Sequence, residues 1–143
     1  MYKKLSLNCL LSIIIRRVEE QTGLRCYDAV PENAPSPFYF AEIIHVTPAN
    51  TKTNYRDTVN VYIHAIAEPG RIKTEVSSVQ INDLIQQLQE ALSTEIELPE
   101  PYYLAIQSDN GVQAIQTDET NEKHAILSYD FTISYGLKCK QGG

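Results

Sequence analysis

A strict alternation of apolar and polar residues near the C-terminus limits the folds open to this chain. Between Ala125 and Leu137 nearly every second side chain is apolar, and most of the residues between them are polar. A period of two places each set on its own face of a β-sheet, so the segment predicts a long strand with one buried face. The apolar set comprises Ala125, Leu127, Tyr129, Phe131, Ile133, Tyr135 and Leu137.

Further strands are predicted upstream by the same alternation. Two of them cover Phe38–Thr47 and about Asp57–Ala67. Two shorter extended pieces, Tyr102–Ile106 and Val112–Gln116, flank Asp109-Asn110-Gly111. Because Asn-Gly favours the tight turns of hairpins, we expect these two pieces to pair as a hairpin.

Two other segments repeat apolar residues every three or four positions, the spacing of one helix face. The first covers Leu7–Val18, with Ser6 suited to cap its start and Thr22-Gly23 to end it. The second runs from about Glu75 to Ser93. The apolar run at residues 10–15 is too short to cross a bilayer, which needs about 20 residues.

The elements follow the order helix, two strands, helix, hairpin and closing strand. Short turns between successive strands favour antiparallel pairing, and two amphipathic helices can cover one sheet face. We therefore predict an α+β fold: a mostly antiparallel sheet of about 4–6 strands with two amphipathic helices packed on one face. The 143 residues suit one domain, so we expect a single domain over 1–143 with a frayed tail at 138–143.

Composition and charge exclude several classes of protein. Hydrophobic residues make up 43% and charged residues 21%, which excludes a disordered chain, a coiled coil and a collagen repeat. The 12 Lys and Arg against 18 Asp and Glu give a net charge of −6, which argues against general nucleic-acid binding. Lys52 and Arg56, with Tyr55 between them, are too few for a basic patch. We expect no specific nucleic-acid partner and no membrane partner.

The sequence lacks recognisable catalytic and metal-binding motifs. His45, His64 and His124 stand singly in predicted strands, although His45 and His64 would be neighbours if their strands pair. Nucleophile motifs and glycine-rich phosphate loops are absent from the sequence. Three cysteines without Cys-x-x-Cys spacing indicate a reducing compartment. We therefore predict a protein that is not an enzyme, with no catalytic residues, no cofactor and no metal.

Two groups of residues are candidates for interaction with a partner. The polar loop Pro48–Arg56 suits a mobile connection, either a long hairpin tip or a segment ordered by a partner. Among the nine tyrosines, Tyr129 and Tyr135 have the parity of the buried face. Tyr102 and Tyr103 follow a proline-rich break and are candidates for a subunit interface. The candidate assembly residues of the loop are Thr51, Lys52, Thr53, Asn54, Tyr55 and Arg56.

The ordered pieces together resemble a known family. After the first helix, Tyr27-Asp28 leads to Pro37-Phe38-Tyr39-Phe40, which is followed by a Val-Asn-Val-Tyr-Ile strand at Val59–Ile63. A helix at Ile81–Leu92 and a closing Tyr-Asp-Phe-Thr-Ile strand at Tyr129–Ile133 complete the pattern. In this order they resemble the tail completion, or head–tail joining, proteins of long-tailed bacteriophages and of prophages of Gram-positive bacteria. The likeness covers nearly the whole chain.

The resemblance implies a small α/β structural protein without catalytic activity. Family members assemble as a ring, typically of six subunits, between the tail tube and the head connector. It implies a role for Pro48–Arg56 in a contact with another subunit or with the tube. Assembly would occur in the bacterial cytoplasm, and the product would reside in the tail or neck of the virion. An acidic chain suits a ring whose lumen passes DNA without gripping it.

Two alternatives remain open. In the first, the protein is another neck or minor tail component, since such proteins share small α/β scaffolds. In the second, the protein is a small cytoplasmic ligand-binding module or enzyme, and residues 31–37, His45 and His64 line a pocket. An enzyme would show a cleft with convergent polar groups and perturbed pKa values. A ring protein would expose sheet edges and apolar patches.

Overall fold

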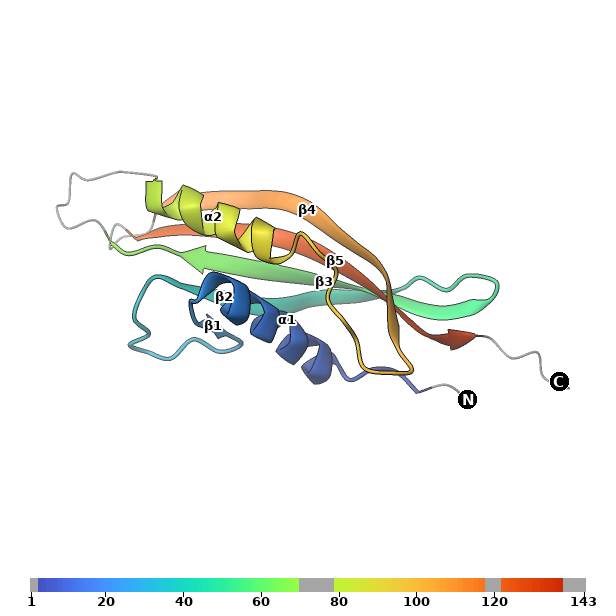
Figure 1. Cartoon of the computed structure of the whole chain (residues 1–143). Helices are drawn as coiled ribbons and strands as arrows, with labels where there is room; N and C mark the ends of the chain where they lie inside the picture. The colour runs from blue at the N-terminus through green and yellow to red at the C-terminus, as the bar shows by residue number, and fades with distance from the viewer. Residues whose placement is uncertain (1–2, 70–78, 118–121, 138–143) are drawn as a thin grey trace, which may run out of the picture.

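One five-stranded sheet forms the centre of the structure, a computed structural model that describes residues 3–69, 79–117 and 122–137. The strand order is β1-β2-β3-β5-β4, and Figure 1 shows β4 along one border and β1 at the other. The elements, in chain order, are α1 (Leu7–Thr22), β1 (Cys26–Tyr27), β2 (Phe38–Pro48), β3 (Asn54–Ile66), α2 (Val79–Ala91), β4 (Tyr103–Thr117) and β5 (Lys123–Leu137).

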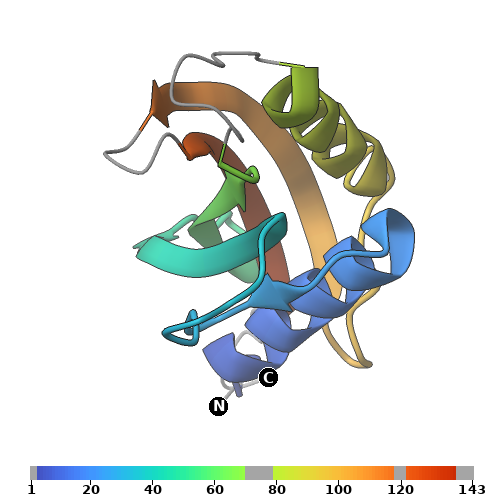
Figure 2. The ribbon, with the colours of Figure 1, turned by 90° about the vertical axis from the view of Figure 1, so that its left-hand side faces the viewer.

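The predicted α+β class is confirmed. The pairs β2–β3, β3–β5 and β4–β5 are antiparallel, and the short β1 adds one parallel pair to β2. Both helices lie on the same face of the sheet, as the two views in Figures 1 and 2 agree. We call the face under the helices the inner face and the opposite one the outer face.

The core lies between the helices and the inner face. The alternating apolar residues of β3 and β5 are almost fully buried, because the helices cover every second side chain of these central strands. Each helix contributes one apolar stripe to the same core. The buried helix residues are Leu10, Ile14 and Val18 of α1 and Ile81, Leu84, Leu88 and Ala91 of α2.

Both predicted ends of the first helix are confirmed. The Ser6 side chain accepts a hydrogen bond from the Cys9 amide, which satisfies one of the free donors in the first turn. Gly23 ends the helix at φ 76°, a left-handed conformation that glycine adopts without a Cβ penalty, and its amide bonds the Glu19 carbonyl. For the second helix, the predicted start at residues 75–78 lies outside the described residues.

The predicted hairpin at Asp109-Asn110-Gly111 is wrong. The chain runs straight through this triplet as one strand, and β4 pairs with β5 on both sides of it. The register shifts between Asp109 and Val112, where Gly111 has φ 88° and its amide bonds the Asp109 side chain. The turn-forming residues therefore make a β-bulge, and the Asn110 side chain donates to the Ser128 hydroxyl of β5.

The segment after α2 is fastened to the rest of the fold by polar side chains. The Gln107 amide group donates to the carbonyls of Leu92 and Thr94 and accepts from the Ile96 amide. On the helix side, the Arg17 guanidinium donates to the Ala91 and Thr94 carbonyls. These contacts fix the path from α2 to the start of β4 and so position Tyr102 and Tyr103.

Candidate assembly surface

The loop between β2 and β3 is an ordered hairpin tip that projects from one end of the sheet (Figure 1). The Ala49 amide donates to the Arg56 carbonyl at 2.9 Å, and the Thr51 amide donates to the Asn54 carbonyl at 3.0 Å. Side chains close the remaining bonds, since the Arg56 amide donates to Asn50 Oδ1 and the Asn54 amide to Thr51 Oγ1. Of the two expected arrangements, the structure shows the hairpin tip. Its backbone amides form hydrogen bonds with other residues of the same loop.

The two groups of candidate residues meet at the base of this hairpin. The Tyr103 hydroxyl lies 3.4 Å from Asn54 Oδ1, to which it donates, and the Tyr103 side chain is 51% exposed. Tyr102 is half-buried instead, with its ring edge-on to Tyr135 at a centroid distance of 6.1 Å. Tyr103 is therefore the more exposed of the two side chains, and Tyr102 packs in part against the core.

A buried carboxylate anchors the inner side of the same region. Asp57 is 4% exposed and accepts from the Tyr135 hydroxyl at 3.1 Å. The Lys4 ammonium lies 2.9 Å from the same carboxylate oxygen. This carboxylate joins the residues before α1 to the base of the hairpin, because Asp57 lies in β3 and Tyr135 in β5. Sequence alternation alone did not mark Asp57, since a charged residue is rarely buried unless it is paired.

Five of the ten exposed large apolar residues and two of the three unpartnered buried polar atoms in the described ranges lie in this half of the sheet. Two polar atoms, Arg56 Nε and Ser134 Oγ, are buried without a hydrogen-bond partner among the described residues. Arg56 and Ser134 face each other across the β3–β5 pair, and Tyr103 lies opposite Ser134 on the other side. The exposed apolar residues are Ile44, Val46, Tyr103, Ile106 and Leu137. We call the hairpin tip together with these residues the hairpin end.

The histidines make a different cluster from the predicted one. The strand register places His45 opposite Asn60, so His45 and His64 are not neighbours. His64 instead lies between Glu42 Oε2, at its Nε2, and His124 Nε2, which is 2.7 Å from its Nδ1. Both ring nitrogens of His64 thus contact protein groups at hydrogen-bond distance. The three side chains therefore link β2, β3 and β5.

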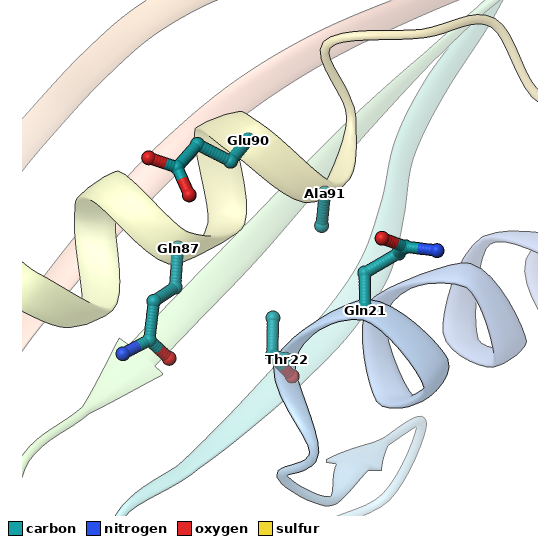
Figure 3. Close-up of a pocket in the computed structure, with 5 residues that line it drawn as sticks. All are labelled: Gln21, Thr22, Gln87, Glu90 and Ala91. Atoms are coloured by element: carbon teal, nitrogen blue, oxygen red, sulfur yellow. The ribbon is translucent and has the colours of Figure 1, made fainter.

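Several hollows border the helices. One of about 210 Å³, between the ends of α1 and α2, is lined by Gln21, Thr22, Gln87, Glu90 and Ala91 (Figure 3). Glu90 is the ionisable group in this lining, and Figure 3 shows its carboxylate turned away from Thr22. A site for general acid–base chemistry needs a base within reach of the group it serves, and this hollow does not provide the pair.

Cys26 is buried near the carboxylates of Glu19 and Asp28. Burial, together with these two carboxylates, raises the pKa of the Cys26 thiol to about 12. This thiol is therefore protonated at neutral pH and a poor nucleophile. Within the described ranges, no group of three or more His, Cys, Asp or Glu side chains is arranged to hold a metal ion. No helix in the described part is long and apolar enough to span a bilayer.

The same fold occurs in a chain of a gene transfer agent virion. A chain in the structure "Virion of native gene transfer agent (GTA) particle" matches with a TM-score of 0.72 and 14% identity, over 92% of this chain and 99% of that one. The family described as "Putative tail termination protein" matches residues 1–141, and the chain belongs to this family. No curated protein matches the sequence. The resemblance to tail completion proteins is thereby confirmed, and the protein is a phage structural protein of the tail or neck.

Proposed function

We propose that the protein completes the phage tail as one subunit of a ring that docks between the tail tube and the head connector. Six subunits is the number typical of the resembled family. The protein acts by self-association and docking, without a cofactor and without catalysing a reaction. Assembly takes place in the bacterial cytoplasm, and the ring remains in the virion.

The hairpin end is the observation that supports docking. Its tip is exposed at Lys52 and Thr53 and is held in one conformation by its own hydrogen bonds. A preorganised loop loses little conformational entropy when a partner binds, so binding energy is not spent on ordering it. Tyr103 beside it supplies a half-exposed aromatic ring of the kind enriched at interfaces.

Gradient-purified particles from a producing strain test the proposal. The tagged protein is expected in the particle fraction at a fixed ratio to the tube protein, and cells lacking it are expected to accumulate separate heads and tails. Its absence from intact particles would overturn the tail role. Normal head–tail joining in cells lacking the protein would overturn the completion role.

Variants of the hairpin tip test the docking surface itself. Deletion of residues 51–54 and the substitution Lys52→Glu are expected to leave the unfolding midpoint of the purified protein almost unchanged and to lower the yield of joined particles. Glu32→Lys, a charge reversal of equal size and opposite sign on an exposed loop elsewhere, serves as the control and should assemble normally. Full joining by the deletion variant would remove the hairpin tip from the docking surface.

A further inference from the structure

The strand β4 forms an open edge with little protection. Within the described residues, no strand pairs with the side of β4 that faces away from β5. Proteins usually guard such an edge with lysines, prolines or a short strand, because its free backbone groups can bind another strand. β4 is 15 residues long and contains no Lys, Arg or Pro, and its β-bulges lie on either side of a regularly paired stretch from Ile106 to Asp109. Ile106 and Ile115 on it are 51% and 53% exposed.

The opposite border of the sheet is also open over most of its length. β1 pairs with β2 only at Tyr39 and Phe40, so the rest of β2, from Ala41 to Pro48, has no neighbour on that side among the described residues. Ile44 and Val46 in this stretch are 40% and 39% exposed. The sheet therefore presents two different unpaired edges, each with exposed apolar side chains.

The two edges offer their regular stretches at the same level of the sheet. The first row of paired residues runs from His45 of β2 through Asn60 and Asp130 to Ser108 of β4. The next row runs from Val46 through Val59 and Phe131 to Gln107, and a third joins Thr47 to Ile106 in the same way. The stretch 45–47 on one border therefore faces outward level with the stretch 106–108 on the other.

The strand directions make these edges complementary between copies. Each of the pairs β2–β3, β3–β5 and β5–β4 is antiparallel, so β2 and β4 run in opposite directions. When a second copy stands beside the first in the same orientation, its β2 therefore meets β4 antiparallel and continues the alternation. Such a contact joins two different surfaces and is head-to-tail, the type that closes into rings.

Charge does not oppose this contact. Neither the stretch 45–47 nor the stretch 106–108 contains a formally charged residue at neutral pH, counting His45 as neutral. The nearest carboxylate on β4 is that of Asp109, which accepts a hydrogen bond from the Gly111 amide. Like charges directly opposite one another would destabilise a strand pair, and none are placed so here.

We propose that neighbouring subunits join by pairing the β4 edge of one copy with the β2 edge of the next, residues 106–108 against residues 45–47. The contact extends the sheet from subunit to subunit. Because this inference identifies the surface by which the ring assembles, it rests on the proposed function. Main-chain hydrogen bonds give the contact its strength. Ile106 then lies opposite Thr47 on the outer face, and Val46 lies opposite Gln107 on the inner face.

Cysteine pairs in assembled particles test the register. Ser108→Cys with His45→Cys, in a Cys9→Ser and Cys139→Ser background, is expected to give disulfide-linked multimers on mild oxidation. Directly opposed Cβ atoms lie about 4.5–5.5 Å apart, close to disulfide distance. Thr117→Cys with His45→Cys is the matched control, because Thr117 is nine positions further along β4, about 30 Å away at strand spacing. Each single variant should yield at most dimers.

The outcomes separate this inference from the function on which it rests. A ladder of multimers in the Ser108/His45 variant alone supports it, as does the loss of rings in Ile106→Lys while Val30→Lys, an exposed apolar site on a loop, assembles. Rings that contain the double variant without cross-links, and rings that form with Ile106→Lys, would overturn the edge contact and leave tail completion standing. Stronger cross-linking of the Thr117 pair would overturn the register. Particles without the protein would overturn both.

Discussion

The Tyr39 hydroxyl of β2 donates a 2.7 Å hydrogen bond to the Leu84 carbonyl in the middle of α2. Tyr39 is fully buried, so this bond lies in the core and joins the sheet directly to the second helix. The apolar stripe of α2 fixes which face packs on the sheet, and the Tyr39 bond fixes where along its length the helix sits. Tyr39 and Leu84 are 45 positions apart in the sequence.

The substitution Tyr39→Phe tests this bond. It is expected to lower the free energy of unfolding by about 1 kcal/mol, because the bond is lost and the Leu84 carbonyl loses its side-chain partner. Urea denaturation followed by circular dichroism measures the change. Tyr62→Phe, a half-buried tyrosine on the outer face, serves as the control and should have a smaller effect. Equal effects would show that the hydroxyl of Tyr39 contributes nothing specific.

Arg17 is expected to be irreplaceable by lysine. Its guanidinium donates to the Ala91, Thr94 and Glu95 carbonyls at 3.3, 2.9 and 3.1 Å, which satisfies backbone acceptors at and beyond the end of α2. Arg17→Ala should cost about 1–2 kcal/mol, since each bond is charge-assisted but partly exposed to water. Arg17→Lys should recover little of this, because an ammonium cannot reproduce the planar fork. Thermal unfolding of both variants decides the point, and full recovery by lysine would contradict it.

A charge on the inner face of α2 should unfold the domain. Leu88 is 0% exposed, so Leu88→Asp places a carboxylate in the apolar core, at a cost of about 4 kcal/mol or more. Gln89→Asp adds the same charge to the exposed side of the helix and should leave the domain folded. Near-ultraviolet circular dichroism and one-dimensional NMR distinguish the two outcomes. A folded Leu88→Asp protein would mean that α2 is not held against the sheet.

The buried tyrosines predict a loss of stability at alkaline pH. Burial raises the pKa of the Tyr39 and Tyr129 hydroxyls above the ordinary 10.0, with Asp109 adding to the shift at Tyr129. A raised pKa in the folded state means that the stabilisation is complete below pH 10 and is lost as the pH rises toward the folded-state pKa. Urea denaturation at pH 8 to 11 should show the fall, with tyrosinate absorbance as the second readout. Tyr129→Phe should fall less steeply, and an identical slope would exclude Tyr129 as a cause.

Local sequence signals predicted those features that depend only on neighbouring residues. Ser6 and Gly23 bound α1 as expected, because a cap needs one side chain or one left-handed residue and no distant partner. The alternation over β5 likewise predicted its buried face, and Tyr129 and Tyr135 are buried as their parity indicated. The single-domain organisation of the whole chain and the interface role of Tyr102 and Tyr103 remain predictions.

Features set by strand register could not be predicted in this way. Asn110-Gly111 has the composition of a tight turn, yet β5 is 15 residues long and offers a partner on both sides of it, so the chain bulges and continues. The Glu42–His64–His124 cluster depends on three strands being aligned at once. The contact of Tyr103 with Asn54 joins residues 49 positions apart, and no sequence pattern around either residue predicts the other as its partner.

The polar side chains on the outer face of the central strands have a consequence for how the sheet finds its alignment. Val59, Val61 and Ile63 would present a nearly identical apolar face after a slip of two residues, so the core alone discriminates poorly between such alignments. The bond between Thr58 and Thr132, and those from Asn60 to Ser128 and Asp130, exist in one alignment only. These pairs therefore specify the register of the sheet. A shifted strand would lose their hydrogen bonds, so its free energy would be higher even in the isolated subunit.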